Sequence, residues 1–435
     1  MKNKKLYLFG TLLVCSSCSI TNFFTPKAKV LKEPSAFRSV VKGADFEALS
    51  ENVLDFSADF TRESTKVLDN KRDNFTVSPL SMFSALAVAT PCSNGNTKTE
   101  LLSGLKTTES LLTSEFGNLF AESNYLRTLG GESNKIVKKE ELTNSIWIDK
   151  NVEFKTDMLN LLADKFYAYS VSVDYRHENK KANRQMSKFV EEKTNGLLTP
   201  NFDFDPDTLF TILNTLYLKS LWNSTSDNLS TSNDEYEFVN RDGSKVKKNL
   251  LETFYQEGRI QRTEAYTSFF AETECKDRIK FVVPNDGYKL EDILTTETLF
   301  EINKQKYNGF DEENNTMYFG KTFFPGFEAE CDIDAKNILK TLGICDLFSD
   351  SKCDFSNLTD EFVYCDKVEH VAKLKVDKKG IEGAAYTAMQ FKGESAPEPP
   401  TYKEIYEEFV VDKAFYFVVS DHNNLPLFSG IVNKI

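Results

Sequence analysis

Residues 380–394 read GIEGAAYTAMQFKGE, and their side chains alternate in character with a period of two. One parity is uncharged, running from Ile381 and Gly383 through Thr387 to Phe391, and the other is mostly polar or amphipathic. Such alternation predicts a strand with one buried and one solvated face. However, the stretch is rich in small residues and runs into SAPEPP, which cannot continue a sheet ladder. An edge strand followed by a turn is one interpretation, and a segment with two alternative positions is the other.

The stretch VDKKGIEGAAYTA (376–388) resembles the hinge of the serpin family, in which small residues precede an exposed reactive loop. Five further segments are similar to serpin segments in the family's order: the start of a helix under the central sheet (NFTVSPLS, 74–81), a central strand (LTNSIWIDK, 142–150), a helix with its turn (FVEEKTNGLL, 189–198), another central strand (ILNTLYLKSLW, 212–222) and the chain end (PLFSGIVNKI, 426–435).

The resemblance covers residues 45–435 and implies the α+β serpin fold. That fold has a large central mixed β-sheet, two further sheets, about eight to nine helices and an exposed reactive-centre loop, here at about 378–408. A length of 435 residues alone suggests two or three domains. Because no Pro/Gly/Ser-rich linker and no internal repeat divides the chain, we expect a single serpin domain over 45–435.

The N-terminus has the features of an export signal over residues 1–18. Three lysines precede a short apolar stretch, Leu6–Val14, and then the sequence CSSC. The stretch is too short to span a membrane and fits a secretory signal. Its ending resembles a bacterial lipoprotein signal, in which Cys18 would be lipidated; simple cleavage and soluble secretion is the alternative. Residues 19–44 show no helix or strand pattern and predict a tether. Because of the signal, we expect an extracellular protein that is secreted or anchored at the cell surface by lipid alone.

Charge and cysteine content restrict the partners further. A net charge of −13 argues against nucleic-acid binding, and we expect the basic runs Lys135–Lys139 and Arg241–Lys248, which acids interrupt, to be solvated faces. Six cysteines follow the signal: Cys92, Cys275, Cys331, Cys345, Cys353 and Cys365. Four of them fall between 331 and 365, so a local disulfide there is one expectation, although six cysteines allow fifteen pairings. A zinc site is the weaker alternative, and we predict no metal.

Catalytic motifs are absent from the sequence. The chain has three histidines, and it contains no G-x-S-x-G, H-E-x-x-H, Walker or dinucleotide fingerprint. Ser395 has Glu394 and prolines as neighbours and no base nearby. We expect no enzyme and no cofactor.

The serpin resemblance assigns four residues to a buried polar network at the centre of the main sheet, the shutter. The matching positions are Ser78, Ser81, Asn214 and His370, and His370 precedes Gly380 by the ten residues that the family pattern requires. Buried polar groups must bond to one another, and such a network can hold two strands together and rearrange when they part. The resemblance also places Trp222 at the breach, where the loop first enters the sheet.

The resemblance implies a suicide-type inhibitor with a metastable fold. A protease attacks the loop and forms an acyl-enzyme, and the cleaved loop then inserts into the central sheet as a new strand. The hinge positions that would insert first are Gly380, Ile381, Glu382, Gly383, Ala384, Ala385 and Thr387. The chain departs from the family at Ile381, where Thr or Ser is usual, and at Lys378, where Glu is usual. These departures keep a non-inhibitory serpin, a surface binding or carrier protein, as the alternative.

The scissile bond sets the target. Glu394–Ser395 lies fourteen residues beyond Gly380 and precedes a small, proline-rich stretch like that of the family. Glu394 would suit a glutamate-preferring serine protease, Lys392 a trypsin-like enzyme, and Phe391 or Met389 a chymotrypsin-like or subtilisin-like one; a cysteine protease is a further alternative. From Gly380 to Phe415 the loop spans 35 positions, longer than is typical, and we expect the prolines and KEIYEEF (403–409) to fill the excess.

Overall fold

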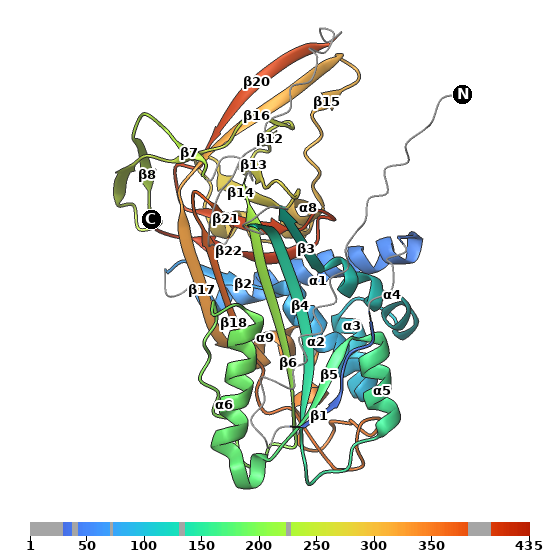
Figure 1. The fold of residues 1–435 in the computed structure, drawn as a ribbon. Helices are drawn as coiled ribbons and strands as arrows, with labels where there is room; N and C mark the ends of the chain where they lie inside the picture. The colour runs from blue at the N-terminus through green and yellow to red at the C-terminus, as the bar shows by residue number, and fades with distance from the viewer. Residues whose placement is uncertain (1–28, 37–41, 70–72, 130–134, 223–227, 382–401) are drawn as a thin grey trace, which may run out of the picture.

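The computed structural model describes residues 29–36, 42–69, 73–129, 135–222, 228–381 and 402–435 (Figure 1). Within these ranges the chain forms nine α-helices: α1 (Ala44–Leu68), α2 (Pro79–Cys92), α3 (Gly95–Gly104), α4 (Glu109–Glu122), α5 (Thr156–Lys165), α6 (Tyr175–Lys193), α7 (Leu290–Ile293), α8 (Thr296–Lys304) and α9 (Lys336–Thr341). Asp174 and Thr108 cap α6 and α4 through their side-chain oxygens, which explains where these helices begin.

The central sheet has eight strands, and most of them pair antiparallel. The path through it is β1-β5-β4-β6-β19-β18-β17, and β3 also pairs with β4. The strands are β1 (Lys29–Lys32), β3 (Asn124–Leu129), β4 (Lys135–Asp149), β5 (Ala168–Val173), β6 (Phe210–Leu221), β17 (Phe327–Asp334), β18 (Glu369–Val376) and β19 (Gly380–Ile381). Since β4 and β5 run parallel, the sheet is mixed, as the sequence led us to expect.

Two six-stranded sheets and a two-stranded ribbon complete the β structure of the described residues. The first sheet contains β7 (Ser230–Thr231), β10 (Leu251–Glu252), β11 (Gln256–Glu257), β15 (Phe310–Asp311), β16 (Thr316–Phe324) and β20 (Lys403–Val410); the second contains β2 (Phe75–Val77), β12 (Gln261–Arg262), β13 (Tyr266–Glu272), β14 (Arg278–Pro284), β21 (Phe415–Ser420) and β22 (Pro426–Val432); the ribbon is β8 (Tyr236–Val239) with β9 (Lys245–Lys248).

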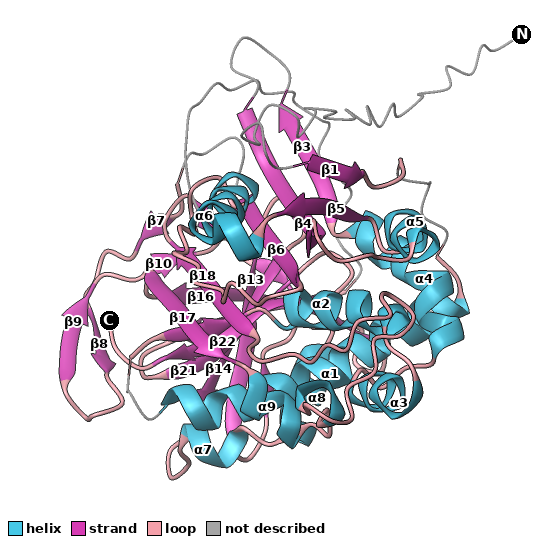
Figure 2. Cartoon of the chain, turned by 90° about the horizontal axis from the view of Figure 1, so that it is seen from below, coloured by secondary structure: helices cyan, strands magenta, loops and turns pink. Residues whose placement is uncertain are grey.

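Helices cover the central sheet unequally. Most of them, including α1 and α2, gather on one side of the molecule, whereas α6 lies alone across the other face of β4 and β6 (Figures 1 and 2). The main core lies on the helical side and includes Phe56, Phe60 and Phe83, all fully buried. A second core, built around Trp147 and Phe189, fixes α6 to its face. The two cores pack against opposite faces of β4 and β6, so both faces of these strands are covered.

The sequence segments behave as expected. Residues 74–81 contain β2 and the start of α2, where Pro79 takes the first helical position that suits proline. Residues 142–150 cover the second half of β4, and residues 212–222 cover most of β6; each segment extends one residue past the end of its strand. Residues 189–198 finish α6 and turn through Asn195 and Gly196, both with positive φ. The chain ends in β22.

Two expected boundaries are wrong. Residues 29–32, within the predicted tether, form β1 and pair with β5, and Val30 packs against the second core. Residues 403–408, within the predicted loop, belong to β20, which pairs in parallel with β16 over eight positions. The acidic sequence KEIYEEF resembles a solvated loop but forms a strand, because β16 pairs with its backbone along its whole length. Glu404 and Glu408 are exposed, and Glu407 pairs with Arg262 at 3.0 Å.

Candidate functional site

The hinge residues Gly380 and Ile381 lie between two strands of the central sheet. As β19 they pair with Leu221 and Ser220 of β6, and Ile381 also pairs with Val376 of β18. In the described part of the chain, β6 and β18 do not pair with each other directly. The facing edges of β6 (residues 210–219) and β18 (residues 369–375) therefore lack each other as pairing partners. We call this missing pairing the pairing gap, and one strand, β19, fills it at one end.

Close backbone contacts hold the turn before the gap. A Cβ atom added to Gly380 would lie 2.3 Å from the carbonyl oxygen of Ser220, so only glycine fits there. The indole Nε1 of Trp222 donates to the carbonyl of Asp377 at 2.7 Å, and its backbone N–H donates to the carbonyl of Lys379 at 3.2 Å. Trp222 thus fastens the turn to the end of β6, at the position that the resemblance assigns to the breach.

Ile381 is fully buried, and its neighbours in the sheet include an unexpected charge. Across the strands, Ile381 pairs with Ser220, and Ser220 pairs with Lys138 of β4; all three are fully buried. The apolar β-branched side chain at this position, where the family usually has Thr or Ser, is thus accommodated inside the sheet. However, the inner face beside it is polar.

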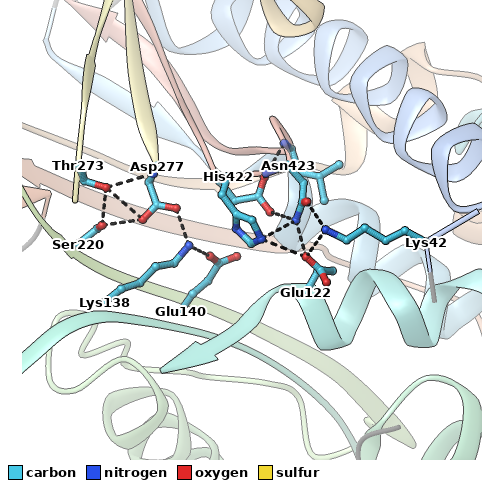
Figure 3. A network of polar contacts seen from close by, with 11 residues as sticks. Lys42, Glu122, Lys138, Glu140, Ser220, Thr273, Asp277, His422 and Asn423 are labelled. Carbon is cyan, nitrogen blue, oxygen red and sulfur yellow. Dashed lines mark hydrogen bonds and ion pairs between the residues drawn. The ribbon is translucent and has the colours of Figure 1, made fainter. Parts of the chain in front are cut away.

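A buried ionic network surrounds Lys138 (Figure 3). Its ammonium lies 2.9 Å from Glu140 Oε2 and 2.5 Å from Asp277 Oδ1. Ser220 Oγ donates to Asp277 Oδ2 at 2.6 Å and also lies 2.8 Å from Thr273 Oγ1. One ammonium thus faces two buried carboxyl groups, in the same cross-strand row as Ile381 and one strand beyond Ser220.

A second polar cluster adjoins this network in Figure 3. Glu122, at the end of α4, accepts hydrogen bonds from Lys42 at 3.0 Å, His422 at 3.1 Å and Asn423 at 2.7 Å. These bonds lower the pKa of Glu122 to about 2 against the opposing effect of its burial, which is the largest single contribution. The cluster ties the turn between β21 and β22 to α4 and leaves His422 exposed.

We expect Glu140 to make stability decline as the pH rises from 6.5 to 8.5. Burial raises the pKa of its carboxyl to about 8; Asp421 and Asp277 add to this rise and Lys138 opposes it. The folded state then binds a proton that the unfolded chain, with a carboxyl pKa of 4.5, has already released. Stability is therefore lost as the pH rises toward the folded pKa. Across this pH range the melting temperature of Glu140→Gln should therefore fall by a few degrees less than that of the wild type.

The neighbouring Glu141 provides the control for this experiment. Lys193 and Lys139 lower the pKa of its partly exposed carboxyl despite desolvation, so it stays ionised throughout the range. Glu141→Gln should keep the wild-type slope. Equal slopes for wild type and Glu140→Gln would show that Glu140 is already ionised at pH 6.5.

The four expected shutter residues form two separate groups. In the first, His370 Nε2 accepts a hydrogen bond from the Ser78 backbone N–H at 3.1 Å, and Ser78 Oγ donates to the carbonyl of Leu427 at 2.8 Å. Burial lowers the pKa of His370 to about 4, so the ring is neutral near pH 7, with its proton on Nδ1. Phe60 packs edge-on against this ring at 5.4 Å.

In the second group, Ser81 donates to Asn214 Oδ1, and Asn214 Nδ2 donates to Asn144 Oδ1 at 2.7 Å. Ser84 donates to the same Asn144 oxygen at 2.9 Å, and Asn144 Nδ2 donates to the carbonyl of Phe166 at 3.0 Å. No hydrogen bond among the described residues joins the two groups directly. The expected single network is therefore wrong in this structure, because Asn214 on β6 and His370 on β18 stand on opposite sides of the pairing gap.

We expect His370→Ala to loosen β18. It leaves the buried Ser78 N–H without an acceptor, at roughly 1–3 kcal/mol, and opens a void beside Phe60. Native gels after mild heating should show ladders of polymers or an inactive monomer with the loop inserted. The control is His177→Ala, whose side chain is 65% exposed. Wild-type behaviour of His370→Ala would mean that this contact does not keep the sheet closed.

Lys138, Glu140, Asn144 and Asp277 were not among the site residues expected from the sequence. The basic run 135–139 was expected to be a solvated face, and this is wrong for Lys138, which is fully buried. A signal existed, because Lys138 and Glu140 share the parity of buried Leu142 along β4. No pattern in the sequence indicated that Asp277 would meet them.

Several expected site residues lie outside the described residues. These are the hinge positions Glu382, Gly383, Ala384, Ala385 and Thr387, the bond Glu394–Ser395, its alternatives Lys392, Phe391 and Met389, and the lipidation site Cys18.

The expected local disulfide is not present, because all six cysteines of the described part are free thiols. Several of their sulfurs lie near backbone carbonyls: Cys331 Sγ lies 3.8 Å from that of His370, and Cys365 Sγ lies 3.4 Å from that of Lys367. Within the same ranges, no group of three or more His, Cys, Asp or Glu side chains could hold a metal ion. No helix built from the described residues is both long enough and apolar enough to cross a membrane.

Comparison with known proteins agrees with this geometry. The family model "Serpin (serine protease inhibitor)" matches residues 51–435. The chain is 26% identical to alpha-1-antiproteinase S of Cavia porcellus, over 97% of both chains. Its fold is similar to that of the native thermophilic serpin tengpin, with a TM-score of 0.72, 20% identity and coverage of 94% of this chain and 100% of the other.

The same fold also occurs in a thyroxine-binding protein. Thyroxine-binding globulin in complex with thyroxine matches with a TM-score of 0.69 and 20% identity, over 89% of this chain and 99% of the other. Together with the mixed central sheet and the strand order, these likenesses confirm the expected fold. The chain belongs to the serpin family.

Proposed function

We propose that this protein is a suicide-type inhibitor of serine proteases that traps its target by inserting the cleaved loop into the central sheet. The observation that carries the proposal is the pairing gap between β6 and β18, which begins where Ile381 is already inserted. Edges without partners are a template for strand addition. The chain that follows Ile381 is the segment placed to fill them.

The register of β19 supports this proposal. If the chain beyond Ile381 continues at the same register, Thr387 comes opposite both Asn214 and His370. The two shutter groups would then receive a hydroxyl between them. Phe391 would come opposite Phe210, at the start of β6, so twelve residues fill the length of that strand. Every position with the parity of Ile381 in this stretch is uncharged, as burial requires.

The chemistry belongs to the protease. Its serine oxygen attacks the carbonyl carbon of residue 394, the amide bond to Ser395 breaks, and the leaving amine takes a proton from the protease's histidine. The chain is then held as an ester on the enzyme. Insertion that outruns hydrolysis of this ester draws the protease along the sheet and traps it. The inhibitor supplies the strand and the free energy of its pairing, and it needs no cofactor.

We place the bond at Glu394–Ser395, which points to a glutamate-preferring serine protease. Lys392 with a trypsin-like target is the first alternative, followed by Phe391 and by a cysteine protease. The N-terminal signal supports an extracellular location, in which the protein is either secreted or held at the cell surface by a lipid on Cys18. These assignments rest on the sequence.

The test is covalent trapping. Incubated with glutamate-specific, trypsin-like, chymotrypsin-like and subtilisin-like proteases, the protein should form a complex stable in SDS with at least one and release a C-terminal fragment. Mass spectrometry of the fragment locates the bond, since a new N-terminus at Ser395 supports Glu394 and one at Gly393 supports Lys392. Digestion of the loop without any trapped enzyme would reject inhibition and leave the fold unaffected.

A non-inhibitory binding or carrier protein is the second candidate. Lys378, exposed on the turn before β19, replaces the usual glutamate, and thyroxine-binding globulin shows that the fold also serves a carrier. In that case the loop would be cleaved as an ordinary substrate.

A further inference from the structure

One face of the sheet formed by β16 and β20 exposes a cluster of aromatic rings. Tyr406 stacks on Phe319 at 5.1 Å, and Tyr255 meets Tyr406 edge-on at 5.0 Å. Tyr406 is 54% exposed and Tyr255 is 44% exposed, and the adjacent Phe254 is 64% exposed. We call Tyr255, Phe319 and Tyr406 the aromatic face. Large rings that pack on one another and remain open to solvent are typical of binding surfaces.

Acidic residues surround the aromatic face. Glu404 and Glu408 share its side of β20, because side chains two positions apart on a strand point the same way. Glu257 of β11 pairs with Phe319, and Glu252 lies 3.1 Å from Lys321. Of these four carboxylates, only Glu252 has a lysine partner among the contacts described here. The surface thus presents aromatic rings within a negative rim, which suits a partner that carries positive charge.

A cation already contacts the rings. Lys321, on the same side of β16, lies 6.0 Å above the ring of Tyr255 and 5.0 Å above that of Phe323. The face therefore accepts an ammonium group over its rings within this chain. A lysine or arginine of a partner could use Tyr406 in the same way.

The position of the aromatic face indicates which partner it binds. Strand β20 begins at Lys403, directly after the segment that contains the proposed scissile bond, and β16 and β20 project from the body of the molecule (Figure 1). A protease that attacks this segment is held next to β20. The face is thus continuous with the site where the enzyme must dock.

We propose that the aromatic face is a second docking site for the target protease. The face would bind a cationic surface of the enzyme beside its active-site cleft. The proposal rests on the proposed function, since it needs an enzyme that attacks the loop. Contacts outside the scissile residue raise the rate of association and select among proteases that share one cleavage preference.

The experiment measures second-order rate constants with the cationic and the anionic form of trypsin, which share specificity and differ in surface charge, and with any protease trapped above. The aromatic variant is Tyr255→Ala with Tyr406→Ala, and the charge variant is Glu404→Gln with Glu408→Gln. We expect cationic trypsin to react faster than anionic trypsin with wild type. The aromatic variant should slow the cationic form about tenfold, and the charge variant should remove most of the salt dependence of its rate.

The matched control is Phe362→Ala with Tyr364→Ala. These rings are 59% and 49% exposed and lie in the chain before β18, away from the aromatic face. The control should react at the wild-type rate, and melting curves should show that all variants are folded. Rates within twofold of wild type for both test variants would overturn the proposal. A dimer of the free protein that the aromatic variant dissolves would also overturn it, because the face would then bind a second copy.

Failure of inhibition is a separate outcome. If no protease is trapped but the loop is cleaved, the same variants are compared by kcat/KM for cleavage. A loss confined to the aromatic and charge variants supports docking although inhibition fails, and equal values reject docking.

Discussion

Cleavage of the loop near Glu394 is expected to raise the melting temperature by roughly 15–30 °C. If residues 380–391 fill the pairing gap, about a dozen backbone hydrogen bonds form at roughly 1 kcal/mol net each. Burial of Met389 and Phe391 adds about 1.5–3 kcal/mol apiece. The sum exceeds the whole stability of many domains. For a chain of this length each kcal/mol shifts the midpoint by about 1–2 °C, extrapolated from smaller domains. Melting curves of intact and nicked protein give the measurement.

The matched control for this prediction is a nicked form that cannot insert. Ile381→Arg, cut at the same bond, should gain little, because its hinge cannot complete the strand. An unchanged or lower midpoint for the nicked wild type would rule out insertion. It would favour the carrier alternative, in which the cut loop stays outside the sheet.

Most of the fold could be predicted from the sequence because its elements carry local signals. Pro79 after Ser78 marks the start of α2, and Asn195-Gly196 marks the turn after α6. In β4, the buried parity that includes Ile146 and Ile148 identifies a central strand. Strand β20 lacked such a signal. Its glutamates resemble a solvated loop, and its pairing depends on β16, some eighty positions earlier in the chain.

The site was predictable only in part. The serpin resemblance assigned Gly380, Trp222 and His370 to the hinge, the breach and the shutter, and spacing supported His370 alone. The charges beneath the hinge could not, because Lys138 and Asp277 come from segments that meet only in the folded chain. The separation of Asn214 from His370 could not be predicted either, because it follows from the missing pairing between β6 and β18 and not from a local signal.

If the protein traps proteases as we propose, Ile381→Arg should turn it into a plain substrate, cleaved at the same bond without a trapped complex. The side chain at position 381 is fully buried between Ser220 and Val376. A guanidinium there would cost several kcal/mol. Lys138 stands beyond Ser220 in the same row, about 10 Å away at two strand spacings, and Asp277 already pairs with its ammonium. The hinge would then leave the sheet, and hydrolysis of the acyl-enzyme would outrun insertion.

Two controls separate this effect from a general one. Ile381→Val keeps an apolar β-branched side chain and should trap protease as wild type does. Lys378→Glu changes charge on the exposed side of the same turn and should also leave trapping intact. The measurement is the ratio of trapped complex to cleaved inhibitor on SDS gels. If Ile381→Arg still traps the enzyme, burial of residue 381 is not required for insertion. The sheet would then have to open beside Lys138 far enough to let water reach the new charge, and β19 would be a resting contact rather than the first step of insertion.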